Sequence, residues 1–183
     1  TSLINKNHHE EWRASFKPLD EKERTKVIEP AIHPKEGPLL MGEVVNAVAE
    51  QAADDAVLVT DVGQNQLFAT RYFKYHHKRS ICTSGGLGTM GYGLGASLGA
   101  KTAFPDKVVV NIAGDGCFRM NMNEIATAVR SEIPVIQVVI DNHVLGMVRQ
   151  WQTLFYGQRY SNTTLRDKTD FVKLAEAMGA RGR

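Results

Sequence analysis

The sequence has little cysteine, no long apolar run and no surplus of one charge. Its 183 residues include only two cysteines, which are too few for a disulfide framework or a cysteine zinc site. We therefore expect reduced thiols. No stretch approaches the ~18 apolar residues of a membrane-spanning helix, and the first residues lack the apolar core of a signal peptide. These absences predict no membrane partner, and a cytoplasmic location if the source is bacterial.

Basic and acidic residues nearly balance, at 22 and 20, and the net charge is +2. No basic stripe is present, so we expect no nucleic-acid partner. The six histidines show no metal-ligand spacing and are expected at the surface. The apolar content of 43% is ordinary, and the length suits one α/β domain with its own core.

Two regions differ in composition. Residues 1–38 are polar and punctuated by prolines, which predicts a linker from a preceding domain, with a short amphipathic helix around Trp12 and Phe16. Residues 39–183 carry the apolar periodicity of a domain. The sequence begins without Met and ends after a helical pattern, so we expect a C-terminally truncated domain, a piece of a longer protein that lacks its last strand.

Within that domain, helical and strand patterns alternate. We predict strands over 56–60, 80–83, 108–113 and 135–140, and helices over 39–53, 64–75, 118–130, 145–155 and 170–178, with a further helix ending near Phe104. This alternation is typical of an α/β fold, a doubly wound parallel sheet flanked by helices.

Polar residues follow two of the apolar strands. Gly114-Asp115-Gly116 follows the strand over 108–113, and Asn142 follows the strand over 135–140. Ligands in such sheets bind at the carboxyl ends of the strands, so these side chains are expected at one edge. Carboxylate and carboxamide oxygens suit Mg²⁺, and helix N-termini after the same strands favour a diphosphate. Taken singly, Asp115 is as well explained as a helix N-cap and Asn142 as a turn residue.

Nearly half of the 16 glycines lie between Ser84 and Gly99. Glycine is unfavourable in a helix by roughly 1 kcal/mol, so the cluster predicts close approach of backbone to a ligand or to another helix. Gly86, Gly88 and Gly91 also match the G-x-G-x-x-G dinucleotide fingerprint, which alone is weak. The acid expected at the end of the next strand is missing, since Asp106 precedes that strand. A Rossmann-type nucleotide-binding module therefore stays an alternative.

Three motifs together carry a family resemblance. The run Ser84 to Gly93, the Gly-Asp-Gly turn with Asn142, and the run Gly146-Met-Val-Arg-Gln-Trp-Gln152 resemble thiamine-diphosphate-dependent enzymes. The similarity covers about residues 39–183 and is greatest to the catalytic subunit of acetohydroxyacid synthase (acetolactate synthase), a carboligase of branched-chain amino acid biosynthesis.

The resemblance implies roles for named residues. Mg²⁺ would be held by Asp115, Asn142 and the carbonyl of Val144. Met90 would prop the cofactor in a bent shape, and Met147 and Trp151 would line the pocket for the second substrate. The cofactor-binding residues implied in this way are Gly63, Gln64, Asn65, Gly88, Met90, Asp115, Gly116, Cys117, Asn142, Val144, Leu145, Gly146 and Met147.

The resemblance also implies an activity and partners. Pyruvate would be decarboxylated and condensed with pyruvate or 2-ketobutyrate. The activating Glu would come from the pyrimidine-binding domain of a partner subunit in a homodimer or homotetramer, so no catalytic residue is expected in these residues and the chain is expected to be inactive alone. A small regulatory subunit and an FAD outside these residues are compatible with the family. Another thiamine-diphosphate 2-ketoacid decarboxylase or an acetyltransferase stays an alternative.

The sequence departs from the family pattern at three positions. Asp141 and Asn65 replace a usual Asn and a common His, and Gly95 replaces a usual Pro. The change at Asn65 puts one hydrogen bond to the diphosphate in question, and Gly95 is expected to loosen the start of its helix.

Overall fold

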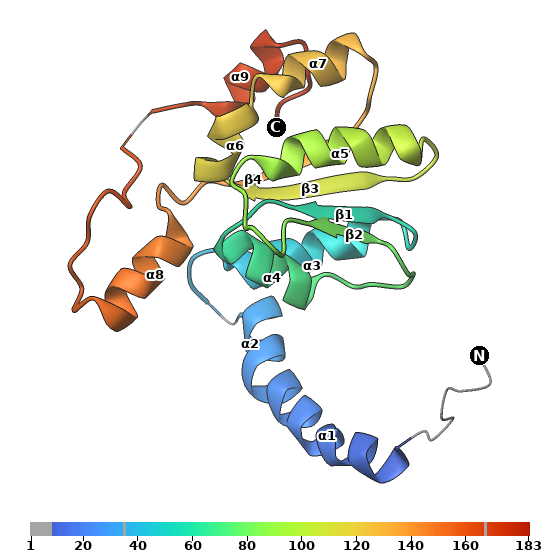
Figure 1. Ribbon diagram of the computed structural model, residues 1–183, viewed down its shortest axis with the longest axis vertical. Helices are drawn as coiled ribbons and strands as arrows, with labels where there is room; N and C mark the ends of the chain where they lie inside the picture. Colours follow the sequence, from blue (N-terminus) through green and yellow to red (C-terminus); the bar gives the residue numbers. More distant parts are fainter. Residues whose placement is uncertain (1–8, 35, 167) are drawn as a thin grey trace.

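The computed structural model describes residues 9–34, 36–166 and 168–183. At its centre lies a parallel sheet in the order β2-β1-β3-β4 (Figure 1). Its strands are β1 (Val57–Thr60), β2 (Ile81–Thr83), β3 (Val109–Gly114) and β4 (Ile136–Ile140). The sheet places β1 and β3 side by side, although a strand and two helices separate them along the chain. The predicted parallel α/β sheet is confirmed.

Helices cover both faces of the sheet (Figure 1). One face carries α3 (Met41–Gln51) and α4 (Gln64–Tyr72). The opposite face carries α5 (Tyr92–Ala103), α6 (Asp115–Asn121), α7 (Glu124–Arg130) and α9 (Phe171–Ala177). Between β4 and α9, α8 (Gly146–Phe155) lies to one side of the sheet. No helix within the described ranges has the length and apolar content needed to cross a membrane.

Alternation along the central strands divides the core between the two faces. Leu58, Val110 and Ile112 pack with α3 and α4, whereas Val57 and Val109 pack on the side of α5. Successive side chains of a strand point to opposite faces, so a strand buried on both sides is apolar throughout. This explains the mostly apolar runs that predicted β1 and β3, in which Thr60 and Asn111 are buried polar exceptions.

Two predicted helices differ in the structure. The helix predicted over 118–130 is wrong as a single element, because α6 begins at Asp115 and the chain breaks between α6 and α7. Phe118, Met122 and Ile125 nevertheless pack in one cluster, so the apolar periodicity continues across the break and hides it. The other helix, α4, ends at Tyr72, where Phe73 turns to extended backbone with ψ 139°.

The N-terminal segment forms a helical arm that extends from the domain (Figure 1). It comprises α1 (Glu10–Glu23), the π-helical segment η1 (Arg24–Ile28) and α2 (Glu29–Ile32). The Trp12 and Phe16 rings meet edge to face at 4.8 Å, so a helix exists where the sequence predicts one. Residues 1–8 and Lys35 of the expected linker lie outside the described residues, and the boundary at residue 38 stays a prediction.

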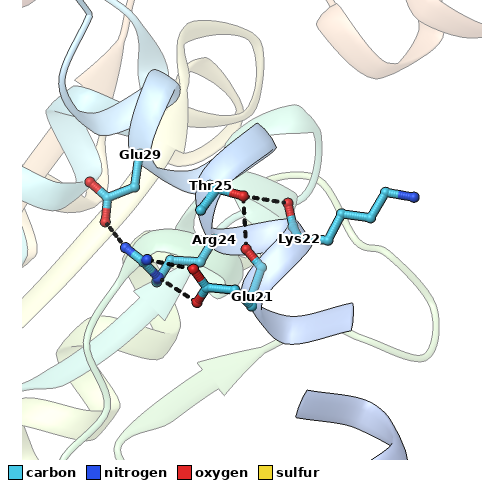
Figure 2. A network of polar contacts seen from close by, with 5 residues as sticks. All are labelled: Glu21, Lys22, Arg24, Thr25 and Glu29. Atoms are coloured by element: carbon cyan, nitrogen blue, oxygen red, sulfur yellow. Dashed lines mark hydrogen bonds and ion pairs between the residues drawn. The ribbon is translucent and has the colours of Figure 1, made fainter. Parts of the chain in front are cut away.

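A polar network runs along the π-helical segment (Figure 2). The guanidinium of Arg24 donates to Glu21 at 2.7 Å and 3.0 Å and to Glu29 at 3.1 Å. The hydroxyl of Thr25 donates to the carbonyl of Glu21 at 2.9 Å. These exposed contacts link α1 to α2, whose Ile32 packs against the α3–α4 core cluster.

Candidate functional site

A cavity of about 220 Å³ lies at the carboxyl ends of β1, β3 and β4. The first turns of α4, α6 and α8 surround it, because each of these helices follows one of the three strands. All thirteen residues that the sequence assigns to cofactor binding line this one cavity: Gly63, Gln64, Asn65, Gly88, Met90, Asp115, Gly116, Cys117, Asn142, Val144, Leu145, Gly146 and Met147. The structure thus brings together residues from four separate parts of the chain.

Five further residues line the cavity that the sequence did not assign to cofactor binding: Met41, Val62, Gly114, Ile140 and Val148. Gly114 and Ile140 are the last residues of β3 and β4, so the strand ends themselves could have indicated them. Met41 is the first residue of α3 and lies near the start of the domain, far along the chain from the other residues of the cavity. No motif marks it, and only the folded chain shows that it reaches the site.

Asp115 is the buried acid of the cavity. It is 1% exposed, and neither carboxylate oxygen has a hydrogen-bond partner among the residues that the structure describes. The nearest cation is the guanidinium of Arg119 at 3.8 Å, beyond hydrogen-bond distance. Burial raises the pKa of Asp115; the charge of Asp141 raises it further, while the N–H of Gly116 and Arg119 act in the opposite direction. An ionised carboxylate left in this way is a natural cation ligand.

The register of the sheet brings two acids together. Gly114 of β3 pairs with Ile140 of β4, so the residues that follow, Asp115 and Asp141, leave the sheet side by side. His143 joins them, with its Nδ1 3.3 Å from a carboxylate oxygen of Asp141. One candidate ligand atom from each of Asp115, Asp141 and His143 lies within 4.8 Å of the other two. His143 lies at the surface, as the sequence predicts for the histidines, with its side chain 59% exposed, and it also joins this cluster.

Asn142 and Val144 lie in the same turn. The side-chain oxygen of Asn142 accepts the N–H of Val144 at 3.2 Å. On the other side of the turn, the His143 carbonyl and the Leu145 N–H bond to the segment around Thr164. In such an antiparallel pair the N–H and C=O of the middle residue point away from the partner strand. The carbonyl of Val144 therefore points to the side of Asn142 and of the cavity that both line.

Glycines allow the backbone to approach the cavity closely. Gly63 has φ +127°, a conformation that other residues rarely adopt. A Cβ on Gly116 would lie 2.5 Å from Leu145, and one on Gly146 would clash with the Gln64 carboxamide. The helices that follow leave free N–H groups at their first turns, which suit an anion such as a diphosphate.

Asp61 fixes the glycine segment. It is 1% exposed, and its carboxylate accepts the backbone N–H groups of Val62, Gly91 and Gly93 at 2.9 to 3.0 Å. A Cβ at Gly93 would lie 2.5 Å from the side chain of Asn111. At Gly93 the backbone does approach a neighbour closely, but this neighbour is the strand beneath α5 and not the ligand or second helix that the sequence predicts. Gly88, with φ +62°, is the glycine of this segment that lines the cavity.

Asn65 and Cys117 line the cavity but are tied to the protein. The side-chain amide of Asn65 donates to the carbonyls of Asp61 and Ile112 at 2.9 Å and 3.2 Å, so its remaining polar atom is an acceptor. The thiol of Cys117 donates to the Val62 carbonyl, and burial, followed by the nearby Asp61 charge, raises its pKa to about 12. Neither side chain is placed to donate to a diphosphate or to act as a nucleophile.

A second cavity of about 510 Å³ adjoins the first and is lined by Met147, Val148, Trp151, Gln152, Tyr156 and Arg159. Met147 and Val148 line both cavities, whereas Trp151 belongs only to the second and is 56% exposed. Trp151 stacks edge to face on Phe155 at 5.6 Å. The structure thus separates the two predicted pocket residues, Met147 between the cavities and Trp151 in the outer one.

The sequence and the fold of the chain are similar to those of known proteins. Residues 61–183 match the family of thiamine pyrophosphate enzymes through its C-terminal TPP binding domain. A solved relative is the thiamine diphosphate-dependent 4-hydroxybenzoylformate decarboxylase of Rhodococcus jostii RHA1, with a TM-score of 0.71 and 26% identity, covering 77% of this chain and 26% of that one.

Curated relatives lie closer in sequence. The chain is 46% identical over 145 residues to the acetolactate synthase isozyme 2 large subunit of Escherichia coli (strain K12), covering 79% of this chain and 26% of that protein. It is 46% identical over 143 residues to the mitochondrial acetolactate synthase catalytic subunit of Aspergillus candidus, covering 78% of this chain and 20% of that protein. The chain spans about a quarter of the length of such relatives.

These matches confirm the resemblance stated from the sequence and decide against the Rossmann-type alternative. They also agree with the chemistry of the cavity, in which an orphaned buried carboxylate fits a cation and three helix N-termini fit a diphosphate. The chain belongs to the thiamine pyrophosphate enzymes and comprises their C-terminal domain, which binds thiamine diphosphate.

Proposed function

We propose that the 220 Å³ cavity holds the diphosphate of thiamine diphosphate through a divalent cation. Asp115, the Asn142 carboxamide and the Val144 carbonyl hold the cation, which is Mg²⁺ in the simplest case. Backbone N–H groups at the first turns of α4, α6 and α8 receive the diphosphate oxygens. Gly63, Gln64, Gly116, Leu145 and Gly146 line these turns, Met90 and Gly88 bound the cavity on the glycine segment, and Asn65 and Cys117 shape its floor.

One observation supports this assignment above the others. The carboxylate of Asp115 is buried among cavity residues without a hydrogen-bond partner, which is unfavourable unless a cation completes the site. A family that binds a cation–diphosphate pair explains this feature, whereas an N-cap does not. The N-cap of α6 is Gly114, and no side chain caps that helix.

We further propose that the parent protein is an acetolactate synthase. The bound cofactor supplies a nucleophilic carbon and an electron sink for decarboxylation of a 2-ketoacid. In this proposal the second ketoacid binds in the second cavity, which has Trp151 at its wall and Met147 at the junction with the first. Apolar contact with one additional methylene contributes about 1–3 kcal/mol, which favours 2-ketobutyrate over pyruvate as the acceptor.

The family match covers only a C-terminal domain. We propose that a Glu from the pyrimidine-binding domain of a partner subunit completes the site in a homodimer or homotetramer. Several relatives are named large subunits, which supports a small regulatory subunit as a further partner. An FAD would bind elsewhere in the parent. The domain boundaries, 1–38 and 39–183, belong to the same proposal.

Calorimetry on the 183-residue chain tests cofactor binding. Thiamine diphosphate should bind in the presence of Mg²⁺ and lose most of its affinity when EDTA removes the metal, whereas NAD should not bind. Asp115→Ala should remove the metal-dependent part. Metal-independent binding, or unchanged binding by the Ala variant, would refute the assignment of Asp115.

A second candidate activity is simple decarboxylation, which the decarboxylase among the solved relatives favours. The product made by the full-length parent distinguishes the candidates, since acetolactate, free aldehyde and acetyl phosphate identify a carboligase, a decarboxylase and an acetyltransferase. The chain alone should yield no acetolactate from pyruvate, thiamine diphosphate and Mg²⁺. If it does, the proposed need for a partner domain is wrong.

A further inference from the structure

The cation site contains more ligands than a magnesium site with Asp115, Asn142 and Val144 requires. Asp141 and His143 flank Asn142, which lines the cavity; their side chains are 36% and 59% exposed, and each has a ligand atom within 4.8 Å of the buried carboxylate of Asp115. The cluster thus offers two carboxylates and one imidazole to a single point. One of the three members is almost completely buried.

A surface ion pair does not account for this cluster. The contact between Asp141 and His143 alone could be an exposed pair of small energetic value. The carboxylate of Asp115, however, faces the second carboxylate without a hydrogen bond of its own. Two like charges at this distance repel each other, and a buried carboxylate without a hydrogen bond is unfavourable. A cation between them removes both penalties.

The backbone holds the imidazole in place. His143 has φ 56°, in the left-handed region, and its carbonyl accepts the N–H of Leu165 at 2.8 Å. This conformation turns the His143 side chain back toward Asp141 while Asn142 bonds to Val144. The turn therefore presents ligands from three consecutive residues to the end of β3.

We propose that Asp115, Asp141 and His143 bind a divalent transition-metal ion of the series Mn²⁺, Co²⁺ and Zn²⁺ more tightly than Mg²⁺. This inference rests on the proposed cation site and specifies its selectivity. Imidazole nitrogen is a good ligand for these ions, whereas Mg²⁺ prefers oxygen and releases its water reluctantly. The candidate ligand atoms lie within 4.8 Å of one another, so a small approach of the exposed Asp141 and His143 side chains to Asp115 brings them to metal–ligand bond lengths of about 2.0–2.2 Å.

The two carboxylates also lead to a prediction about the order of binding of ion and cofactor. Their combined charge attracts a divalent cation before any diphosphate is present. The ion therefore binds to the chain in the absence of cofactor, which separates this inference from cofactor binding in experiment.

Cobalt is the probe for the test. Co²⁺ is titrated into the cofactor-free 183-residue chain and followed by visible absorption and calorimetry, with Zn²⁺ as competitor and Mg²⁺ in parallel. Asp141→Asn removes one charge at constant shape, and His143→Asn removes the nitrogen ligand with a residue that tolerates the left-handed conformation. Each should weaken Co²⁺ binding by roughly tenfold or more, since even outer-shell changes in metal sites have effects of that size.

The matched control is His76→Asn, because His76 also lies beside an acid, Asp54 at 3.9 Å, but away from any buried carboxylate. It should leave the Co²⁺ titration unchanged, and circular dichroism checks that every variant is folded. Co²⁺ binding no tighter than that of Mg²⁺, or equal effects of the His143 and His76 variants, would overturn the inference. If Asp115→Ala meanwhile abolishes Mg²⁺-dependent binding of thiamine diphosphate, the proposed function stands and only the metal selectivity is wrong.

Discussion

Replacement of Asp115 by Asn should stabilise the metal-free chain and remove its response to metal. The substitution keeps the shape of the side chain and deletes the negative charge of a residue that is 1% exposed and whose carboxylate is hydrogen-bonded by no described residue. Burial raises the pKa of Asp115, which means that folding disfavours its ionised form. The wild-type chain therefore loses stability as the pH rises from the ordinary pKa of Asp through the raised one, and the Asn variant does not.

The size of the effect follows from the environment. An unsatisfied buried polar group is unfavourable by about 1–3 kcal/mol, more when it is charged. The lost attraction to Arg119 offsets a small part, because the two groups are 3.8 Å apart. For a chain of this length each kcal/mol corresponds to about 2–4 °C in Tm. A cation and cofactor at a hundredfold excess over their Kd would stabilise the wild-type chain alone by about 2.7 kcal/mol.

Thermal unfolding followed by circular dichroism measures both effects. At pH 7 in EDTA the variant should melt at a higher temperature than the wild type, and the difference should shrink at acidic pH, where the carboxyl of the wild type is protonated. With Mg²⁺ and thiamine diphosphate the order should reverse. A variant that is less stable than the wild type in EDTA, or that responds equally to metal and cofactor, would show that the carboxylate is satisfied within the protein.

Three further predictions concern other parts of the site. Iodoacetamide at pH 8 should label Cys82 and leave Cys117 unmodified, as read by mass spectrometry, because burial raises the pKa of Cys117 to about 12; labelling of both thiols in the folded chain would contradict this. Gly93→Ala should destabilise the chain by about 1–3 kcal/mol through overpacking, because its Cβ would lie 2.5 Å from a buried carboxamide oxygen of β3. Gly95→Ala in the same helix meets nothing within 4 Å and should stabilise by up to about 1 kcal/mol, so urea unfolding that ranks the pair in the other order would refute the packing argument. Trp151→Ala should leave the Tm nearly unchanged, since the residue is 56% exposed, but should lower the preference of the full-length parent for 2-ketobutyrate over pyruvate in a competition assay; an unchanged preference would remove Trp151 from the acceptor pocket.

Most of the sheet could be predicted from the sequence because its strands are apolar on both faces. Val57–Thr60 and Val109–Gly114 are short and largely apolar, with Asn111 as a buried polar residue in the second, and the helices between them imply parallel pairing. The ends of the helices were harder to predict from the sequence. The break between α6 and α7 is invisible in a pattern whose apolar residues, Phe118, Met122 and Ile125, keep the helical spacing across it. Such breaks depend on backbone geometry that side-chain periodicity does not encode.

The cavity residues likewise divide into those whose role the sequence predicts and those whose role it does not. Its glycines and its Asp and Asn follow strand ends, and strand ends can be predicted, so their convergence could be anticipated. The bonding of Asn65 could not, because its amide spans the carbonyls of Asp61 and Ile112 on two strands that are distant in sequence. The contribution of Met41 likewise arises only when α3 packs beside α4.

Asp141 shows most clearly why the register matters. From the sequence alone it is a neighbour of Asn142 and a mild departure from the family pattern. A shift of one residue between neighbouring strands would turn its side chain to the opposite face of the sheet. In the structure Gly114 pairs with Ile140, so the residues after both strands start from the same level, and the carboxylate of Asp141 comes to lie beside that of Asp115. The strand pairing thus brings the carboxylate of a single substituted position beside Asp115, and the metal preference that we propose rests on this alignment of β3 with β4.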